Sequence, residues 1–331
     1  MDWERRCIRT CAAVLICAVV MRLASAGFFQ PVGQLLENPK VASFLVYLQT
    51  GRVVRLEAEA AGIEPEATAQ TDAPEVLRTS GTLPAFSAED ADMISIKSSS
   101  SYDPDIAELL TQPLDFDLSG EEPTVLILHT HTSESYTPTS GQDYEETSEY
   151  RTLDQQYNML RIGDLVAQVL EDAGISVLHD REFHDYPSYN GSYSDAAEST
   201  ASYLSQYPSI RLVLDLHRDA ADTDYGQMVT QCTVDGQDSA QLMLVVGTGS
   251  GGLSHPNWEE NLSLALKLHV VLERQNPGIC RNLVLTYSRY NQHLSPGALL
   301  VEVGAAGNTL DEALVAANAL AEGIIALFQG T

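Results

Sequence analysis

The pattern of hydrophobic and polar positions changes near residue 124. Between residues 57 and 117 the chain is rich in Ala, Glu, Thr, Ser, Pro and Asp and shows no sustained period. From Thr124 onward, short apolar runs typical of buried strands alternate with segments whose apolar residues recur every three or four positions, as on one face of a helix. The pattern therefore predicts a flexible acidic linker followed by a folded α/β domain.

The predicted strands and helices follow one another in near-regular alternation. The expected strands are 124–128, 175–178, 211–216, 242–246, 283–287 and 298–303. The expected helices are one whose apolar face runs through 162–169 and that ends at Gly174, then 196–206, 257–275, and a last helix opened by the capping box Thr309-x-x-Glu312. Such alternation predicts a mainly parallel, twisted sheet with helices on both faces.

The N-terminus has the pattern of an export signal. Arg5, Arg6 and Arg9 precede the apolar run 11–21, and the small residues 24–26 follow it. The run is shorter than the roughly 20 residues of a spanning helix, which favours cleavage, although extension through Phe29 would make a retained anchor. Either outcome places the bulk of the chain outside the cytoplasm. The expected organisation is a signal or anchor over 1–29, a membrane-proximal element and acidic linker over 30–120, and a functional domain over 121–331.

Composition and charge exclude several classes of protein. The 18 Lys and Arg residues against 46 Asp and Glu give a net charge of −28, which argues against nucleic acid and against a broad electrostatic membrane-binding surface. No CxxC or Cys/His finger spacing occurs, so a thiolate zinc site is not expected. Cys232 and Cys280 are expected to be buried free thiols, although pairing outside the cytoplasm stays open.

Imidazoles and carboxylates stand at or near the ends of three predicted strands. The first strand runs into His129, His131 and Glu134, the strand 211–216 runs into His217, and the strand 298–303 contains Glu302 near its end. Active sites of open α/β sheets lie beyond the carboxyl ends of the strands. Taken singly, each of these residues is more often a hydrogen-bonded or solvated side chain, and Glu302 could pair with an arginine. Their joint occurrence at one sheet edge favours a metal site.

Zinc held by two His and one Glu with an open water position is the usual hydrolytic arrangement. His131-x-x-Glu134 has the short spacing of such a site, and His217 arrives from a distant strand as the third ligand. Glu302 would then be free to act as the general base. Asp215, on the same strand face as His217, is the candidate for orienting an imidazole.

The candidate substrate-binding residues are less specific. Tyr186, Tyr189 and Asn190 belong to a turn-rich polar and aromatic loop suited to stacking on a sugar or holding a peptide, with a surface loop as the alternative. Arg289 could bind a carboxylate in a fork or form a structural ion pair. Arg218, next to His217, is included among these candidates. The glycines at 247–252 lack a nucleotide-binding fingerprint.

Several long segments, in order, resemble the stage II sporulation protein P family: ILHTHTSESYTP, HDYPSYNGSY, YPSIRLVLDLHRDA, HPNWEENLSLALKL and RYNQHLSPGALLVEVGAAGNTLDEAL. The resemblance covers about 124–328. It implies a zinc-dependent cell-wall hydrolase of endospore formers that acts during engulfment of the forespore. The family cleaves the N-acetylmuramoyl–L-alanine amide of peptidoglycan, is reported to cut peptide cross-links, and has a fold similar to zinc N-acetylmuramoyl-L-alanine amidases.

The resemblance also implies partners and a location. The family works with sporulation protein D, a lytic transglycosylase, and with sporulation protein M, a multi-spanning membrane protein. Its N-terminal segment is usually a retained anchor, so the expectation becomes a single-pass membrane protein. The catalytic domain would then lie between the mother-cell and forespore membranes.

The family motifs assign the site residues. The His-Thr-His motif lies at His129 and His131, and counting from the strand makes His131 the better first ligand, with His129 kept as a further catalytic candidate. His217 is the third ligand and Glu302 the late catalytic Glu. Glu134 is expected as the second ligand, with Asp154 as the alternative because Asp154-x-x-x-Asn158 resembles the Glu-x-x-x-Asn of the related amidases.

Two other functions are consistent with the same residues. A carboxypeptidase-like cell-wall peptidase would use the same His131-x-x-Glu134 spacing. A non-catalytic peptidoglycan-binding module would keep the fold with a vacant site, which the complete His and Glu set argues against.

Overall fold

The structure is a computed structural model that describes residues 84–114, 117–224 and 226–330. These belong to one unit, Glu75–Thr331. The expected signal or anchor, 1–29, and the first part of the expected linker lie outside the described residues. Among the described helices, none combines the length and apolar character that a membrane crossing requires.

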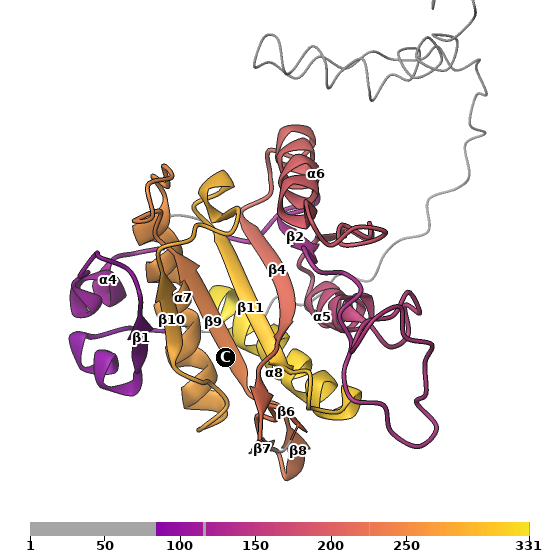
Figure 1. Ribbon diagram of the computed structural model, residues 1–331. Helices are drawn as coiled ribbons and strands as arrows, with labels where there is room; N and C mark the ends of the chain where they lie inside the picture. The colour runs from indigo at the N-terminus through magenta and orange to yellow at the C-terminus, as the bar shows by residue number, and fades with distance from the viewer. Residues whose placement is uncertain (1–83, 115–116, 225, 331) are drawn as a thin grey trace, which may run out of the picture. The chain divides into compact units, whose positions relative to one another are not determined.

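A seven-stranded sheet forms the centre of this unit, in the order β1-β10-β9-β11-β4-β2-β3 (Figure 1). Its strands are β1 (Ile96–Ser98), β2 (Val125–Leu128), β3 (Val177–His179), β4 (Leu212–Asp219), β9 (Leu242–Gly247), β10 (Leu283–Thr286) and β11 (Ala298–Ala305). All six strands predicted from the sequence are present. Two short hairpins follow β4 and precede β9 along the chain. They are β5 (Asp222–Thr223) with β6 (Gly226–Gln227), and β7 (Cys232–Val234) with β8 (Gln237–Ser239).

Strand direction divides the sheet into two groups. Neighbouring strands are parallel except at the junction of β9 with β11, which is antiparallel. The prediction of a mainly parallel sheet is therefore confirmed, with one reversal that the sequence analysis did not anticipate. Strands β2, β4 and β11 run in the same direction, so their carboxyl ends meet at one edge of the sheet.

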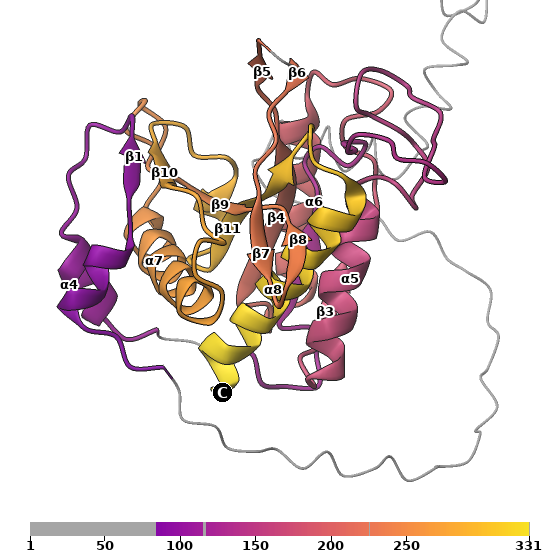
Figure 2. The same ribbon diagram turned by 90° about the horizontal axis from the view of Figure 1, so that it is seen from below.

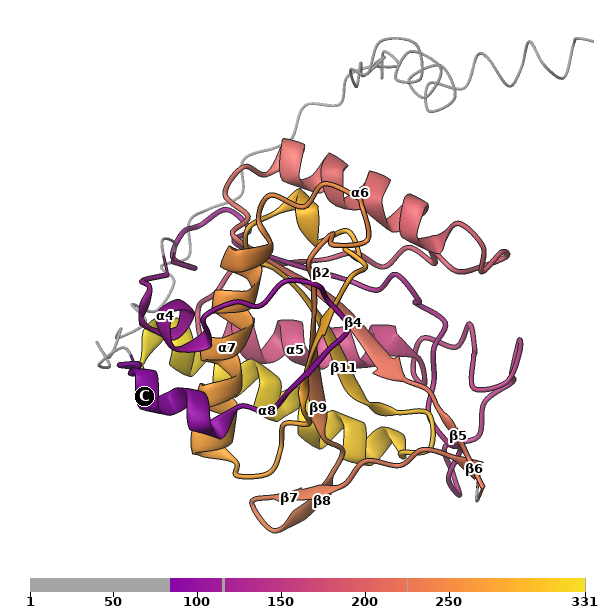
Figure 3. The ribbon, with the colours of Figure 1, turned by 60° about the vertical axis from the view of Figure 1, so that its left-hand side comes forward.

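Helices cover the two faces of the sheet unequally. Helices α5 (Met159–Asp172), α7 (Trp258–Gln275) and α8 (Leu310–Gln329) lie on one face, and α6 (Ser192–Gln206) lies on the other (Figures 2 and 3). On β11, the side chains of Leu299, Val301 and Val303 enter the large core beneath the three helices. Side chains alternate along a strand, so Leu300 and Glu302 point to the face that carries α6. That face is only partly covered, which leaves room for a pocket.

Local sequence signals fix the ends of the helices. Helix α8 begins with the predicted capping box, in which Thr309 and Glu312 each accept a hydrogen bond from the other's backbone N–H. Helix α5 ends in a Schellman motif: the Ile175 N–H donates to the Leu170 carbonyl, and Gly174 takes a φ of 79°. These contacts satisfy terminal groups that helical hydrogen bonds leave free.

The expectation of a flexible linker up to residue 120 is wrong for residues 84–114. This segment contains the 3-10 helix η1 (Ala88–Met93), strand β1 and helix α4 (Ile106–Thr111). Strand β1 pairs with β10, and the Leu109 carbonyl accepts hydrogen bonds from Ser263 and Lys267 of α7. The elements are short and rich in Ser, Asp and Pro, so their apolar period was too brief to detect in the sequence.

Candidate active site

The carboxyl ends of β2, β4 and β11 bring the predicted polar residues into one cavity of about 330 Å³. Its polar lining consists of His131, Glu134, His217, Arg218, Asp219 and Glu302. Its apolar floor consists of Met243, Val245, Val284 and Leu300, which project from β9, β10 and β11. The cavity therefore lies on the face of the sheet that α6 leaves partly open.

The turn after β2 is fixed by buried carboxylates. The backbone N–H and hydroxyl of Thr130 donate to the two oxygens of Asp215, at 2.8 and 2.6 Å. The hydroxyl of Ser133 donates to Asp185 at 2.6 Å. These contacts anchor the backbone on both sides of His131, so the imidazole is delivered to the cavity by a rigid turn.

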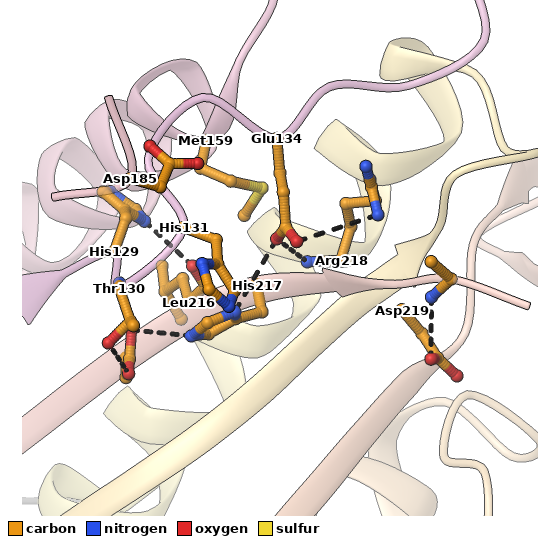
Figure 4. Close-up of polar contacts among 12 residues, drawn as sticks. His129, Thr130, His131, Glu134, Met159, Asp185, Leu216, His217, Arg218 and Asp219 are labelled. Atoms are coloured by element: carbon orange, nitrogen blue, oxygen red, sulfur yellow. Dashed lines mark hydrogen bonds and ion pairs between the residues drawn. The ribbon is translucent and has the colours of Figure 1, made fainter. Parts of the chain in front are cut away.

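His217 lies between two carboxylates, those of Glu134 (Figure 4) and Asp215. Its Nδ1 is 3.6 Å from Oε2 of Glu134, and its Nε2 is 2.9 Å from Oδ1 of Asp215. Burial lowers the pKa of His217, but Asp215 and Glu134 outweigh this effect and raise the pKa well above the usual value. Asp215 thus holds one nitrogen of His217 while the other faces Glu134, which confirms the expected proximity of Asp215 to an imidazole.

Glu134 is held by two arginines. Its Oε1 lies 3.2 Å from Arg151 Nη2 and 3.7 Å from Arg218 Nη1. Its Oε2 accepts a hydrogen bond from the backbone N–H of Arg218 at 3.3 Å. Burial raises the pKa of Glu134, but Arg218, His217 and His131 lower it more strongly, to about 2. The carboxylate is therefore ionised at neutral pH, as a metal ligand must be.

His131 is held by aromatic and hydroxyl groups. Its ring stacks on Tyr189 with centroids 4.6 Å apart and meets the His217 ring edge-on at 5.2 Å. The Tyr189 hydroxyl lies 3.2 Å from His131 Nε2, and the Ser192 hydroxyl lies 3.4 Å from Nδ1. Burial is the main cause of a lowered pKa, so the imidazole is neutral at neutral pH and able to bind a metal.

Glu302 is the carboxylate of the site that lacks a positive partner. Its Oε2 is buried and finds no hydrogen-bond partner among the described residues. Burial raises its pKa to about 8, and the neighbouring Glu134 and Asp219 add to this effect against the opposing charge of His217. A raised pKa and a free oxygen are the properties of a group that exchanges protons rather than one that makes a structural ion pair.

The donor set fits zinc in chemistry. Two imidazoles and an ionised carboxylate are ligands that Zn²⁺ takes in hydrolytic sites. Within the described residues, the three ligand atoms do not all lie within 4.8 Å of one another. Glu134 is drawn toward Arg151 and His131 toward Tyr189, so binding of one ion requires small movements of these side chains.

Two predicted residues lie apart from the cavity. The ring of His129 bonds to the Leu216 carbonyl at 3.0 Å and to His179 Nε2 at 2.9 Å, so it supports β2 and β4 rather than facing the lining. The expectation of a direct catalytic role for His129 is therefore corrected. Asp154 is exposed and caps its own turn by accepting from the Gln156 N–H, which leaves Glu134 as the better placed second ligand.

The predicted substrate-binding residues also separate. Tyr186, Tyr189 and Asn190 are all exposed on one loop outside the cavity lining, and Tyr189 is the one that reaches the site, by stacking on His131. Arg289 donates to the Ser254 carbonyl away from the lining. Arg218 lines the cavity, but its guanidinium donates to the carbonyls of Ser135 and Tyr150 and pairs with Glu134. Its role there is to position Glu134.

Arg151, Tyr193 and Tyr290 contribute to the site but were not predicted from the sequence. Arg151 pairs with Glu134 and Asp185 and lies 4.9 Å from the Tyr189 ring centroid. Tyr193 and Tyr290 line the cavity, and their ring centroids are 5.8 Å apart. Both tyrosines lie inside segments that the sequence analysis quoted, NGSY and RYNQ, which was the available signal. Arg151 lies in a loop without any pattern that would mark it.

Two solved structures illustrate the similarity to known folds. The N-acetylmuramoyl-L-alanine amidase AmiC2 of Nostoc punctiforme is 17% identical with a TM-score of 0.36, over 62% of this chain and 97% of the other. An N-acetylmuramoyl-L-alanine amidase from Clostridium difficile 630 is 16% identical with a TM-score of 0.37, over 62% and 94%. Similarities at this level carry no argument about activity.

Sequence relatives are more informative. Stage II sporulation protein P of Bacillus subtilis (strain 168) is 30% identical over 217 residues, which is 62% of this chain. The match spans about half of that protein, 51% of its length. Residues 56–325 match the profile of the family described as Stage II sporulation protein P (SpoIIP), and this range includes every residue of the cavity lining. The chain therefore belongs to the stage II sporulation protein P family.

Proposed function

We propose that this protein is a zinc-dependent peptidoglycan hydrolase of sporulation that cleaves the N-acetylmuramoyl–L-alanine amide. The observation that carries the proposal is the convergence of His131, Glu134, His217 and Glu302 in one cavity at the strand ends. Membership of the sporulation family supports the substrate and the context. Cleavage of peptide cross-links, which the resemblance also implies, would use the same residues.

His131, Glu134 and His217 are the residues that would hold the zinc ion. When bound, zinc polarises an amide carbonyl and lowers the pKa of a coordinated water. Asp215 fixes the ring orientation of His217 through the 2.9 Å contact with Nε2, which leaves Nδ1 directed at Glu134. Arg218, His217 and His131 keep Glu134 ionised.

Glu302 is the proposed proton carrier. Within the described part of the chain its Oε2 has no partner to compete for a proton, and its register partner on β4 is His217. Hydrolysis of an amide needs one group that removes a proton from water and returns it to the leaving nitrogen. A pKa raised to about 8 makes Glu302 suited to the second half of this task, and a nearby cation would lower that pKa enough for the first half.

The wider biological setting remains part of the proposal. We propose an N-terminal anchor within 1–29 and a domain that works between the mother-cell and forespore membranes during engulfment. Sporulation proteins D and M are the proposed partners, on the family resemblance alone. With a net charge of −28, the chain cannot use long-range attraction to an anionic wall, so short contacts such as those of Tyr189 must supply affinity.

Zinc content and release of stem peptide from purified cell wall test the proposal together. The zinc-loaded chain should release stem peptide, and His217→Ala should lose the zinc of this cavity and the release while its circular dichroism stays unchanged. Binding to the wall without release, at full zinc content, would favour a peptidoglycan-binding module. Full release by metal-free His217→Ala would remove the zinc mechanism.

A further inference from the structure

A second group of metal-ligating side chains lies away from the active site, where α7 ends and the chain approaches β10. Among the described residues, His269, Glu273 and Cys280 are the group whose ligand atoms all lie within 4.8 Å of one another. His269 and Glu273 are four residues apart on α7 and so share one helix face. Cys280 is placed beside them by its bridge to Leu242 at the start of β9.

The group lies on the opposite face of the sheet from the active-site cavity. Leu242 and Leu244 of β9 enter the core beneath α7, and Cys280 packs against that core. Met243 and Val245, which alternate with them, line the cavity instead. The two sites therefore share no residue, and a metal in one cannot be the metal of the other.

His269 provides the independent sign of a ligand. The residue is 3% exposed, yet its Nδ1 is buried and finds no hydrogen-bond partner among the described residues. An unsatisfied buried nitrogen is energetically unfavourable, so such atoms are rare without a reason. One ring nitrogen of His269 lies within 4.8 Å of ligand atoms of Glu273 and Cys280. The ring already bonds to the backbone of Met93, so the unpartnered Nδ1 is the nitrogen that is available to them.

The other two groups are fixed in place by the backbone. Glu273 accepts from the N–H of Cys280 at 2.7 Å and from the N–H of Gly278 at 2.9 Å, one bond to each oxygen. Each oxygen keeps a further lone pair for a metal. A divalent ion bound at the Cys280 sulfur would release the thiol proton and form a thiolate.

We propose that His269 Nδ1, Glu273 and Cys280 Sγ form a second, structural site for a divalent transition metal, with zinc as the expected ion. An imidazole, a carboxylate and a thiolate are zinc ligands, and water would complete the tetrahedron. Ligand atoms of such a site lie roughly 3.3–3.8 Å apart for bonds of about 2.0–2.3 Å, so the present cluster needs only small side-chain shifts. The ion would tie the end of α7 to the turn that leads into β10.

Cobalt substitution separates this site from the catalytic one, because only the second site contains a sulfur ligand. The test uses the full-length chain under reducing conditions, with Cys7, Cys11 and Cys17 changed to Ser so that Cys232 and Cys280 are its remaining thiols. Added Co²⁺ should produce a sulfur-to-cobalt charge-transfer band. The band should disappear in Cys280→Ser, which changes a single atom, and in His269→Ala. It should persist in the matched control Cys232→Ser and in the catalytic-site variant His217→Ala.

Metal content provides the second measurement. Cys280→Ser should bind one zinc fewer per chain than its parent and retain wall hydrolysis, whereas His217→Ala should lose hydrolysis but keep the band. Absence of the band in the parent, or its survival in Cys280→Ser, would overturn the second site. Neither result would bear on the proposed hydrolase, which is judged by zinc and activity at His217.

Discussion

His217 on β4 and Glu302 on β11 are direct register partners in the parallel part of the sheet. The first faces two carboxylates, and the second has a buried carboxyl oxygen without a partner among the described residues. One strand pair therefore presents the proposed metal-ligating imidazole and the proposed proton-exchanging carboxyl side by side. This pairing separates the two roles that hydrolysis of an amide requires.

Glu302→Gln should abolish turnover without removing zinc. The amide keeps the size of the side chain but cannot take a proton from water, and loss of a general base typically costs about 10²–10⁴-fold in rate. The measurement is the hydrolysis rate of purified wall together with zinc content. If the variant loses zinc as well, Glu302 is a ligand and the base must be assigned elsewhere.

Tyr189→Phe should bind zinc more tightly than the natural chain. The change keeps the ring that stacks on His131 but removes the hydroxyl 3.2 Å from Nε2, which competes with a metal for that region. Loss of one such hydrogen bond, about 1 kcal/mol, corresponds to roughly a fivefold gain in affinity. Competition with a zinc chelator measures the gain, and Tyr186→Phe, outside the cavity lining, is the matched control. Weaker binding by Tyr189→Phe would show that the hydroxyl supports the site.

The stability that the buried pair His184–Asp180 contributes should fall as pH rises above 6.5; its Nε2 and Oδ2 atoms are 2.9 Å apart. Burial lowers the pKa of His184, but Asp180 raises it to a net value above 6.5; the pKa of Asp180 is lowered below 3.8, since His184 outweighs its burial. The His184 contribution is therefore complete below pH 6.5 and is lost as pH rises through the folded-state pKa, whereas the Asp180 contribution is present above pH 3.8 and is lost on acidification.

Urea unfolding of the natural chain and of His184→Gln at a series of pH values checks this. The difference in free energy of unfolding between the two should be largest between pH 3.8 and 6.5 and should shrink at higher pH. A difference that is constant from about pH 6 to 9 would mean that the pair does not titrate in this way.

A fragment covering 84–331 should be more stable than one covering 121–331. The shorter fragment lacks β1 and α4 and removes the Leu109 carbonyl, which accepts from the Ser263 hydroxyl at 2.8 Å and from buried Lys267 Nζ at 2.7 Å. The Lys267 ammonium keeps the Ser263 hydroxyl but loses the Leu109 carbonyl, and this loss together with the lost packing of Leu109 and Leu110 should cost at least about 2 kcal/mol. Thermal unfolding of both fragments measures the difference. Equal midpoints would restore the linker boundary expected from the sequence.

Most of the architecture could be predicted because the central strands are mainly apolar runs, while α5 ends at a glycine stop and α8 begins with a capping box. The reversal between β9 and β11 is foreshadowed in the sequence by the lack of a helix between two consecutive strands. No helix is predicted between the strands 211–216 and 242–246, and parallel neighbours need a crossover of a dozen or more residues, usually helical. Residues 84–114 were missed because β1 has only three residues and gains its stability from β10.

The candidate site was predicted as far as strand ends allow. His131, Glu134, His217 and Glu302 meet because parallel strands deliver their carboxyl ends to one edge. Sequence could not separate His129 from His131, since the turn after Leu128 breaks the strand alternation and sends the two rings in different directions. Nor could it bring Cys280 to His269 and Glu273, because that contact depends on how the turn after α7 folds back.

The new chain ends in digested cell wall test the central claim most directly. Mass spectrometry of purified peptidoglycan treated with the zinc-loaded full-length chain should find stem peptides with a free L-alanine amino group and glycan with an intact lactyl carboxyl. The same digest with His217→Ala should contain neither. Peptides trimmed only at their carboxyl ends, with the lactyl amide intact, would contradict the amidase assignment and indicate a carboxypeptidase-like enzyme instead.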